Sequence, residues 1–146
     1  MEVLSDLGNG LRVTLTERER LTPHEEIIEQ RVVTRVAKLR ELGFYKPIVV
    51  DEVTGTILDG HHKTAAAGHL NLDLVPVLLL DYLIDDRITV EVWPGCGRTS
   101  ITKAEVLDMA ASDRVFPPKT SRHLMPFALP ELAVPLERLR LSIHSP

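Results

Sequence analysis

The short connections between apolar segments constrain the fold of this chain most. Apolar runs over residues 47–50, 56–58 and 75–80 have the length and composition of strands, and helical patterns lie between or beside them. A parallel strand pair needs a crossover of about a dozen residues or more, and the gaps here are too short for that unit to repeat. We therefore predict an α+β fold with a small mixed sheet and flanking helices, in preference to a doubly wound sheet.

Periodicity and turn residues predict the remaining elements. They are strands over residues 11–15 and 88–93 and helices over residues 61–70, 102–111 and 136–141. Thr102 and Glu105 form a capping box at the start of one of these helices. Thr22 and Glu25 have the same spacing, which predicts that a further helix begins there and ends at Gly43.

Composition bounds the function classes. The 146 residues fit one domain over 1–146, and Cys96 is the single cysteine, so no internal disulfide forms and a reducing compartment, the cytoplasm, is expected. The N-terminus has no signal-peptide pattern, and the apolar run over 75–80 is far too short to span a membrane. A net charge of −4 argues against nucleic acid as a partner, although it is compatible with a local basic patch.

The segment from Asp59 to Lys63 is the first candidate site. It reads Asp-Gly-His-His-Lys between a short strand and a helix, so the unpaired N–H groups of a helix start lie beside two histidines and a lysine. Such a turn binds phosphate, and Gly60 allows close approach to the backbone. Asp59 is suited to a Mg²⁺ ion that bridges phosphates. Two other interpretations stay open, namely Asp59 as a plain N-cap with exposed histidines, and a metal site made by the histidines.

The segment over residues 119–123 is the second candidate. It places a lysine, an arginine, a histidine and two hydroxyls in five consecutive positions. Arg122 can bind a carboxylate or phosphate through two parallel hydrogen bonds, while Lys119 supplies a point charge. The alternative is a solvated basic loop that follows Pro117 and Pro118.

Three further residues are considered singly. Glu25 is either part of a capping box or a base that deprotonates a hydroxyl for attack on phosphorus. Trp93, the only tryptophan, is either an edge-of-core residue or one wall of a ligand pocket. Cys96 lies between glycines without a visible catalytic partner.

In this order, the clusters resemble the free-serine kinases of the ParB/sulfiredoxin-like superfamily. The matching segments are residues 23–26, 57–63, 76–82, Trp93 and residues 115–123. They correspond to the family's Pro-His-Glu segment, its Asp-Gly-His-His-Arg phosphate motif, the strand that follows it, a pocket tryptophan and a Pro-Lys-Thr-Thr-Arg-His motif. Lys63 stands where arginine is usual, Ser121 replaces a threonine, and the connection over 94–118 is shorter than in some members.

The resemblance implies a single ParB N-terminal/sulfiredoxin-type domain in which residues 117–146 carry the last motif and a tail packed on it. It implies that Glu25 is the catalytic base and that Asp59 is both catalytic and the ligand of Mg²⁺. The expected nucleotide-binding residues are Asp59, Gly60, His61, His62 and Lys63. The expected substrate-binding residues are Trp93, Lys119, Thr120, Ser121, Arg122 and His123.

The activity implied by the resemblance is phosphorylation of free L-serine, or a close analogue, to O-phospho-L-serine with ATP or ADP as donor. The expected partners are the nucleotide and the amino acid, without membrane or nucleic acid, and a homodimer is compatible with the chain. One alternative is a ParB-like module that binds CTP or ATP for regulation or near DNA. Another is a sulfiredoxin-type repair enzyme, which needs a cysteine at the phosphate turn, where this chain has His61 and His62.

Overall fold

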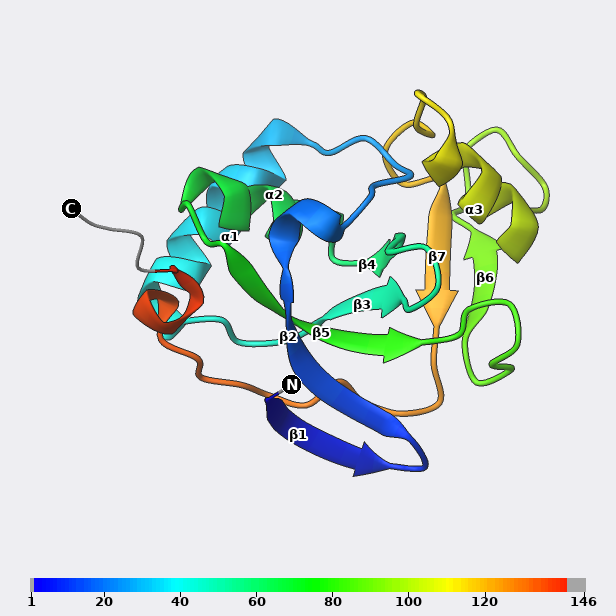
Figure 1. Ribbon diagram of the computed structural model, residues 1–146. Helices are drawn as coiled ribbons and strands as arrows, with labels where there is room; N and C mark the ends of the chain where they lie inside the picture. The colour runs from blue at the N-terminus through cyan, green and yellow to red at the C-terminus, as the bar shows by residue number, and fades with distance from the viewer. Residues whose placement is uncertain (1, 142–146) are drawn as a thin grey trace.

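The computed structural model describes residues 2–141 as two sheets and three helices with short 3-10 turns (Figure 1). The main sheet has five strands in the order β1-β2-β5-β3-β4, and a smaller sheet pairs β6 with β7. The strands are β1 Val3–Gly8, β2 Leu11–Glu17, β3 Ile48–Asp51, β4 Ile57–Asp59, β5 Leu74–Leu80, β6 Thr89–Val92 and β7 Ser121–Leu124. The helices are α1 Glu29–Leu42, α2 His61–His69 and α3 Lys103–Ala111, with 3-10 turns at Arg18–Arg20 and Leu136–Leu139. The predicted α+β class is confirmed.

A parallel strand pair, β3 with β5, lies at the centre of the main sheet, and its other strand pairs are antiparallel. The chain crosses from β3 to β5 through β4 and α2, so the sheet is mixed as predicted. Val77 and Leu78 of β5 are fully buried and belong to two different core clusters. Because both faces of β5 are covered, its sequence is a continuous apolar run without alternation.

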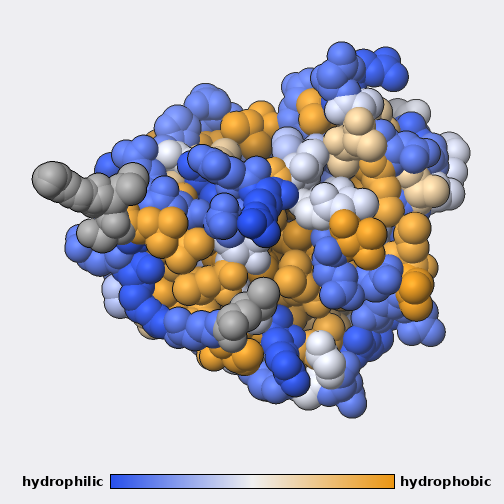
Figure 2. All heavy atoms as spheres, in the orientation of Figure 1, coloured by the Kyte–Doolittle hydropathy of each residue, from blue (hydrophilic) through white to orange (hydrophobic). Residues whose placement is uncertain are grey.

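Two hydrophobic cores lie on the two sides of the main sheet. One core packs Val32 and Leu39 of α1 and Ala66 of α2 with residues of the sheet. The other packs Val106 of α3 and Phe116 with the opposite face. On the face drawn in Figure 2, apolar residues show in several places, below the middle and along the right edge, with hydrophilic residues between them.

The first helix begins later than its predicted capping box. Helix α1 starts at Glu29 with Ile28 as its N-cap, and no side chain caps it, so the helix predicted to begin at Thr22 is wrong over its first residues. The preceding segment is extended because it pairs with distant backbone. The Thr22 N–H donates to the Gly55 carbonyl at 2.9 Å, and residues 24–26 bridge to Phe116 in the same way. Glu25 therefore has no capping role in α1.

Local sequence patterns predicted several other helices and strands correctly. Thr102 and Glu105 make both hydrogen bonds of a capping box at the start of α3. The apolar strand β5 and helix α2 begin and end within one residue of their predicted bounds. The helix predicted over 136–141 is a shorter 3-10 turn. Strands β1 and β7 were not predicted from the sequence.

The segment after β7 returns across the molecule and joins the end of α1. Val134 pairs with Phe44, and the Leu132 N–H donates to the Tyr45 carbonyl at 2.8 Å. The two segments approach so closely that a Cβ on Gly43 would lie 2.6 Å from the Val134 carbonyl oxygen, and Gly43 has a φ of +74°. Glycine is thus required there, and the contact fixes the backbone on either side of Tyr45. No helix in residues 2–141 is long and apolar enough to cross a membrane.

Candidate active site

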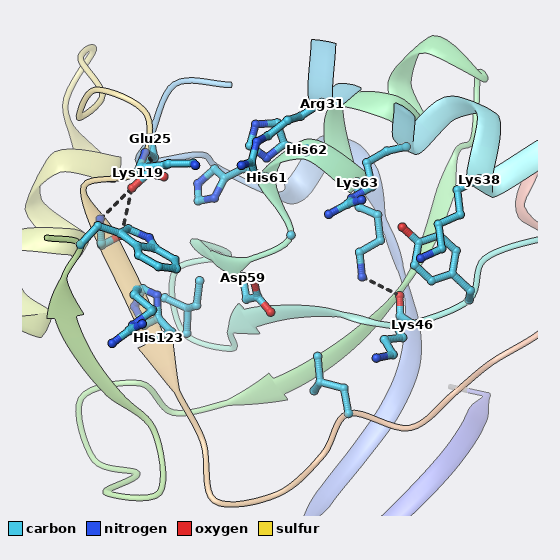
Figure 3. Close-up of a pocket in the computed structure, with 18 residues that line it drawn as sticks. Glu25, Arg31, Lys38, Lys46, Asp59, His61, His62, Lys63, Lys119 and His123 are labelled. Atoms are coloured by element: carbon cyan, nitrogen blue, oxygen red, sulfur yellow. Dashed lines mark hydrogen bonds between the residues drawn. The ribbon is translucent and has the colours of Figure 1, made fainter. Parts of the chain in front are cut away.

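A cavity of about 520 Å³ opens where the start of α2, the end of β4, one face of α1 and the β6-β7 sheet meet (Figure 3). It brings together residues that lie far apart in the sequence. The predicted site residues that line it are Glu25, Asp59, Gly60, His61, His62, Lys63, Trp93, Lys119, Ser121, Arg122 and His123. Thr120 is the exception, because it is buried and its hydroxyl donates to the Pro117 carbonyl at 2.7 Å.

The cavity also contains residues that the sequence analysis missed. They are Arg31, Arg35, Lys38, Tyr45, Lys46, Leu58 and Leu129. Arg31, Arg35 and Lys38 follow an i, i+4, i+7 spacing, which places them on one face of α1. That spacing is visible in the sequence and predicts a basic face on the helix. It does not predict that this face lines a cavity.

The cavity is strongly cationic although the whole chain has a net charge of −4. Its lining includes seven lysine and arginine side chains and two carboxylates, those of Glu25 and Asp59. Cations gathered in a concave site raise the local concentration of anions and attract them over a distance. The site is therefore suited to a ligand with several negative charges.

Helix α2 starts at the floor of the cavity with free backbone donors. Gly60 is its N-cap, with φ +110°, and no side chain caps this helix end. The positive φ favours glycine, and a Cβ on Gly60 would also lie 3.2 Å from Cγ1 of Ile48, which is a crowded contact. Asp59 therefore does not act as the N-cap. It ends β4 with an exposed side chain at the middle of the cavity (Figure 3).

The two histidines in the first turn of α2 hold the extended segment before α1. His61 Nε2 accepts a hydrogen bond from the His24 N–H at 3.1 Å, and His62 Nε2 accepts one from the Ile28 N–H at 3.0 Å. An Nε2 that accepts belongs to a neutral ring whose proton is on Nδ1. Burial, more than neighbouring charge, lowers the pKa of both rings, and that of His61 falls well below its ordinary value. Only Nδ1–H of each ring remains to donate to a ligand.

Lys63 lies at the end of the cavity away from Glu25. Its ammonium donates to the carbonyls of Lys46, at 3.2 Å, and Pro47, at 3.5 Å. Burial lowers its pKa to about 8, with a smaller opposing effect from the Asp59 carboxylate. Lys63 therefore keeps most of its positive charge near neutral pH.

Glu25 accepts hydrogen bonds from the start of β7. Its Oε1 accepts from the backbone N–H groups of Thr120, at 3.1 Å, and Ser121, at 3.0 Å, and lies 3.1 Å from the Ser121 hydroxyl. Its Oε2 accepts from the Lys119 N–H at 3.1 Å. Consecutive N–H groups arranged around one anion form a backbone nest, and Lys119 has the positive φ of +58° that such an arrangement uses. Oε2 has a single protein donor and keeps acceptor capacity toward the cavity.

His24 lies fully buried behind the cavity. Its Nδ1 is 2.8 Å from the Ile57 carbonyl, and its Nε2 is 2.9 Å from the Ser121 hydroxyl. Burial lowers the pKa of His24 to about 4, so the ring is neutral and Nδ1 donates to Ile57. The single hydroxyl proton of Ser121 then goes either to His24 Nε2 or to Glu25 Oε1. This link couples the histidine to the carboxylate.

Strand β7 presents two further predicted residues in different environments. His123 Nε2 is 2.8 Å from the Tyr82 hydroxyl, and burial lowers the pKa of His123 to about 3. Arg122 pairs with Glu91, which is its cross-strand neighbour on β6, and its guanidinium lies 4.7 Å from the centre of the Trp93 ring. His123 is thus a neutral hydrogen-bonding group, whereas Arg122 supplies charge against an aromatic wall.

The residues present fit a phosphate-bound Mg²⁺ better than a metal held by protein alone. No group of three histidine, cysteine or carboxylate side chains within residues 2–141 could hold an ion. Mg²⁺ commonly binds through one or two carboxylates and the phosphates of a substrate. Asp59 supplies one such carboxylate next to the uncapped start of α2. The metal site that the histidines were considered for does not fit, since their Nε2 atoms accept backbone hydrogen bonds.

Fold and cavity together define a small α+β protein with a strongly cationic cavity. No family model matches the chain. It is 33% identical over 94 residues to a protein named ATP-dependent L-serine kinase from Staphylothermus marinus, covering 61% of this chain and 37% of that protein. It is 30% identical over 82 residues to the ADP-dependent L-serine kinase SerK of Thermococcus kodakarensis, covering 53% and 34%. The chain thus spans about a third of the length of these kinases.

A shorter relative is matched over nearly its full length. The chain is 30% identical over 85 residues to the ParB-like nuclease domain-containing protein YnaK of Escherichia coli, which is 56% of this chain and 97% of that protein. The solved structure of a free serine kinase in complex with AMP has the same fold, with a TM-score of 0.78 at 19% identity over 87% of this chain and 93% of the other. The chain therefore belongs to the family of ParB-like nuclease domain-containing proteins. Its similarity to proteins named L-serine kinases confirms the resemblance seen in its motifs.

Proposed function

We propose that this protein transfers a phosphoryl group from a nucleotide to the hydroxyl of free L-serine or a close analogue, giving O-phospho-L-serine. The observation that carries the proposal is the position of the Glu25 carboxylate and the Gly60–Lys63 turn on one cationic cavity. A base for a hydroxyl and a cradle for phosphates are the two parts that such a transfer needs. The relatives named L-serine kinases support serine as the acceptor.

The acceptor end of the cavity combines Glu25, Lys119, Arg122, His123 and Trp93. The serine oxygen forms a bond to the terminal phosphorus while the bond from that phosphorus to the bridging oxygen breaks. The serine proton goes to Glu25 Oε2, and the bridging electron pair leaves with the shortened nucleotide. Lys119 and Arg122 neutralise the negative charge of the transferring group and of the amino-acid carboxylate.

The donor end lies at the start of α2. Its free backbone N–H groups and Lys63 bind the phosphates, and Asp59 is the residue that would hold Mg²⁺. Mg²⁺, when bound, neutralises phosphate charge during transfer. Gly60 keeps this backbone open, since any side chain there would meet Ile48.

His61 and His62 have an additional positioning role in this proposal. By holding the N–H groups of His24 and Ile28, they fix the segment that carries Glu25 against the phosphate turn. The base and the donor site are therefore coupled through α2.

The free cysteine Cys96 is compatible with a reducing compartment, and we propose on that ground that the protein is cytoplasmic.

A nucleotide-binding regulatory module without transfer is the second candidate. The observation that favours it is the set of four hydrogen bonds at Glu25, which give this carboxylate a structural role even without a substrate. A sulfiredoxin-type reaction is disfavoured, because Cys96 is not among the residues that line the cavity.

Phosphorus NMR of the purified protein with Mg²⁺ and L-serine distinguishes the two candidates. ATP, ADP and CTP are supplied in separate samples. We expect a phosphomonoester signal that grows only when serine is present. Nucleotide binding by a folded protein, without such a signal for any donor, would favour the regulatory module.

A further inference from the structure

The cavity has a second cationic region, of whose side chains the proposed transfer uses only Lys63. Arg31, Arg35 and Lys38 of α1 line the cavity along roughly 10 Å of helix axis, together with Lys46 and Lys63. Lys38, Lys46 and Lys63 lie near one another at the end away from Glu25, whereas Arg31 lies beside His62 (Figure 3). Within residues 2–141, none of these five cations forms a salt bridge with a carboxylate. We call these five residues the α1 cationic face.

Such an arrangement is unfavourable without an anion. Like charges spaced i, i+4 on a helix, as Arg31 and Arg35 are, destabilise it. The charges also act on one another across the cavity, because Arg35, Lys46 and Lys38 each lower the pKa of Lys63, after the larger effect of burial. A ligand with several negative charges would relieve this repulsion.

Tyr45 provides an independent sign of a ligand at the same place. Its hydroxyl is buried and has no hydrogen-bond partner among residues 2–141. The ammonium groups of Lys38 and Lys63 lie 4.5 Å and 5.2 Å from the centre of its ring. A buried hydroxyl without a partner is costly, and a phosphate oxygen between the two lysines would satisfy it.

We propose that the α1 cationic face selects a phosphoryl donor with three consecutive phosphates, a nucleoside triphosphate, by binding the phosphates that are not transferred. This inference rests on the proposed function and names its donor class. When the terminal phosphorus leaves for the serine oxygen, the negative charge of the broken bond develops on the remaining diphosphate. In this proposal the diphosphate lies against Arg35 and Lys38, which line the cavity and act on the neighbouring Lys63. A nucleoside diphosphate leaves only one phosphate there and uses fewer of the five cations.

Helix α1 offers a matched control for this idea. Arg40 is on the same helix, is exposed, and does not line the cavity. Replacing it removes an equal charge from α1 without touching the α1 cationic face. The variants Arg35→Gln and Lys38→Gln each remove one charge from the face and keep a polar side chain.

Equilibrium titration calorimetry with Mg²⁺ and AMP, ADP, ATP or inorganic tripolyphosphate tests the proposal without any turnover. We expect affinity to rise from AMP to ADP to ATP and tripolyphosphate to bind at the same site. Arg35→Gln and Lys38→Gln should each weaken ATP by about tenfold or more, since a charge-assisted hydrogen bond contributes about 1.5–3 kcal/mol, and should weaken AMP much less. Arg40→Gln should change neither affinity.

Equal weakening of ATP and AMP, or no weakening in either variant, would overturn the proposal. So would ADP binding as tightly as ATP in the unmodified protein. These outcomes are independent of catalysis. If phosphoserine forms from ADP as readily as from ATP, the donor inference fails while the proposed function stands. If triphosphate selectivity is found but no donor gives phosphoserine, the proposed function fails while the donor inference stands.

Discussion

At the residue scale, the histidines of the cavity are neutral rings that accept hydrogen bonds and hold neighbouring segments together. His24 shows this most clearly, because it lies between the Ile57 carbonyl and the Ser121 hydroxyl with no exposed surface. Its ring packs edge-on against His61, with centroids 4.6 Å apart, and lies near His123. Proton uptake by any of these rings would place a charge among the others. The positive charge of the site therefore comes from lysine and arginine.

The lowered histidine pKa values predict a loss of stability in acid. Burial lowers the pKa of His24 to about 4 and that of His123 to about 3, whereas an unfolded chain keeps values near 6.5. Between these values the unfolded state binds protons that the folded state does not, so stability falls as pH falls below about 6.5. Each ring should remove about 2 kcal/mol from the free energy of unfolding between pH 7.5 and pH 5.

Urea unfolding at these two pH values measures this effect. His123→Gln should flatten the pH dependence, since one of the large histidine shifts is lost. His69→Gln is the matched control on the exposed last turn of α2 and should retain the full dependence. Equal unfolding free energies at pH 5 and pH 7.5 in the unmodified protein would contradict the neutral, buried state of the cluster.

At the element scale, the site depends on how α2 begins. Its first turn supplies free N–H groups to the cavity, and its histidines hold the extended segment before α1. That segment in turn carries Glu25 to the backbone nest at the start of β7. Hydrogen bonds thus link the start of α2 to the segment that carries Glu25, and Glu25 to the start of β7.

Gly60→Ala tests this dependence. Alanine at φ +110° is strained, and its Cβ would lie 3.2 Å from Ile48, so we expect a loss of about 1–3 kcal/mol in stability together with weaker nucleotide binding. Gly95→Ala is the control, because Gly95 has φ +82° but a Cβ on it would meet nothing within 4 Å. It should show a smaller loss of stability and unchanged binding. Nucleotide affinity at the wild-type level in Gly60→Ala would contradict the assigned role of this turn.

Elements with local sequence signals were predicted, and elements that depend on long-range pairing were missed. Helix α3 and strand β5 were predicted because their signals are local, a capping box in one case and a continuous apolar run in the other. Strand β7 was missed because its ladder partner β6 lies about thirty positions earlier, and nothing within its four residues indicates that pairing. The extended segment before α1 was mistaken for a helix because its bridges to Thr56 and Phe116 are long-range.

The candidate site was predicted only in part, because local motifs are visible in the sequence and long-range contacts are not. Short motifs identified Glu25, the turn after Asp59 and the segment from Lys119 to His123, and the structure brings them to one cavity. Their catalytic and binding roles remain predictions. The basic face of α1 was missed because its spacing reveals a charged helix face, while the cavity that it lines forms only when β4, α2 and β7 are assembled.

At the scale of the whole molecule, charge is distributed unevenly. The chain is acidic overall, yet its main site combines seven cations with two carboxylates. The two cores on either side of the mixed sheet hold α1, α2 and the β6-β7 sheet around this cavity. A small protein with a net negative charge can thereby present a strongly positive site to an anionic ligand.

The most direct test of the central claim is serine-dependent turnover in Glu25→Gln, compared with Glu26→Gln. Glu26 is the adjacent exposed carboxylate and does not line the cavity, so its variant controls for a charge change in this segment. Glutamine at position 25 cannot accept the serine proton, and we predict that turnover falls by about 10²–10⁴-fold while the fold and nucleotide affinity are largely kept. Glu26→Gln should remain as active as the wild type. A folded Glu25→Gln protein that phosphorylates serine at the wild-type rate would contradict the account.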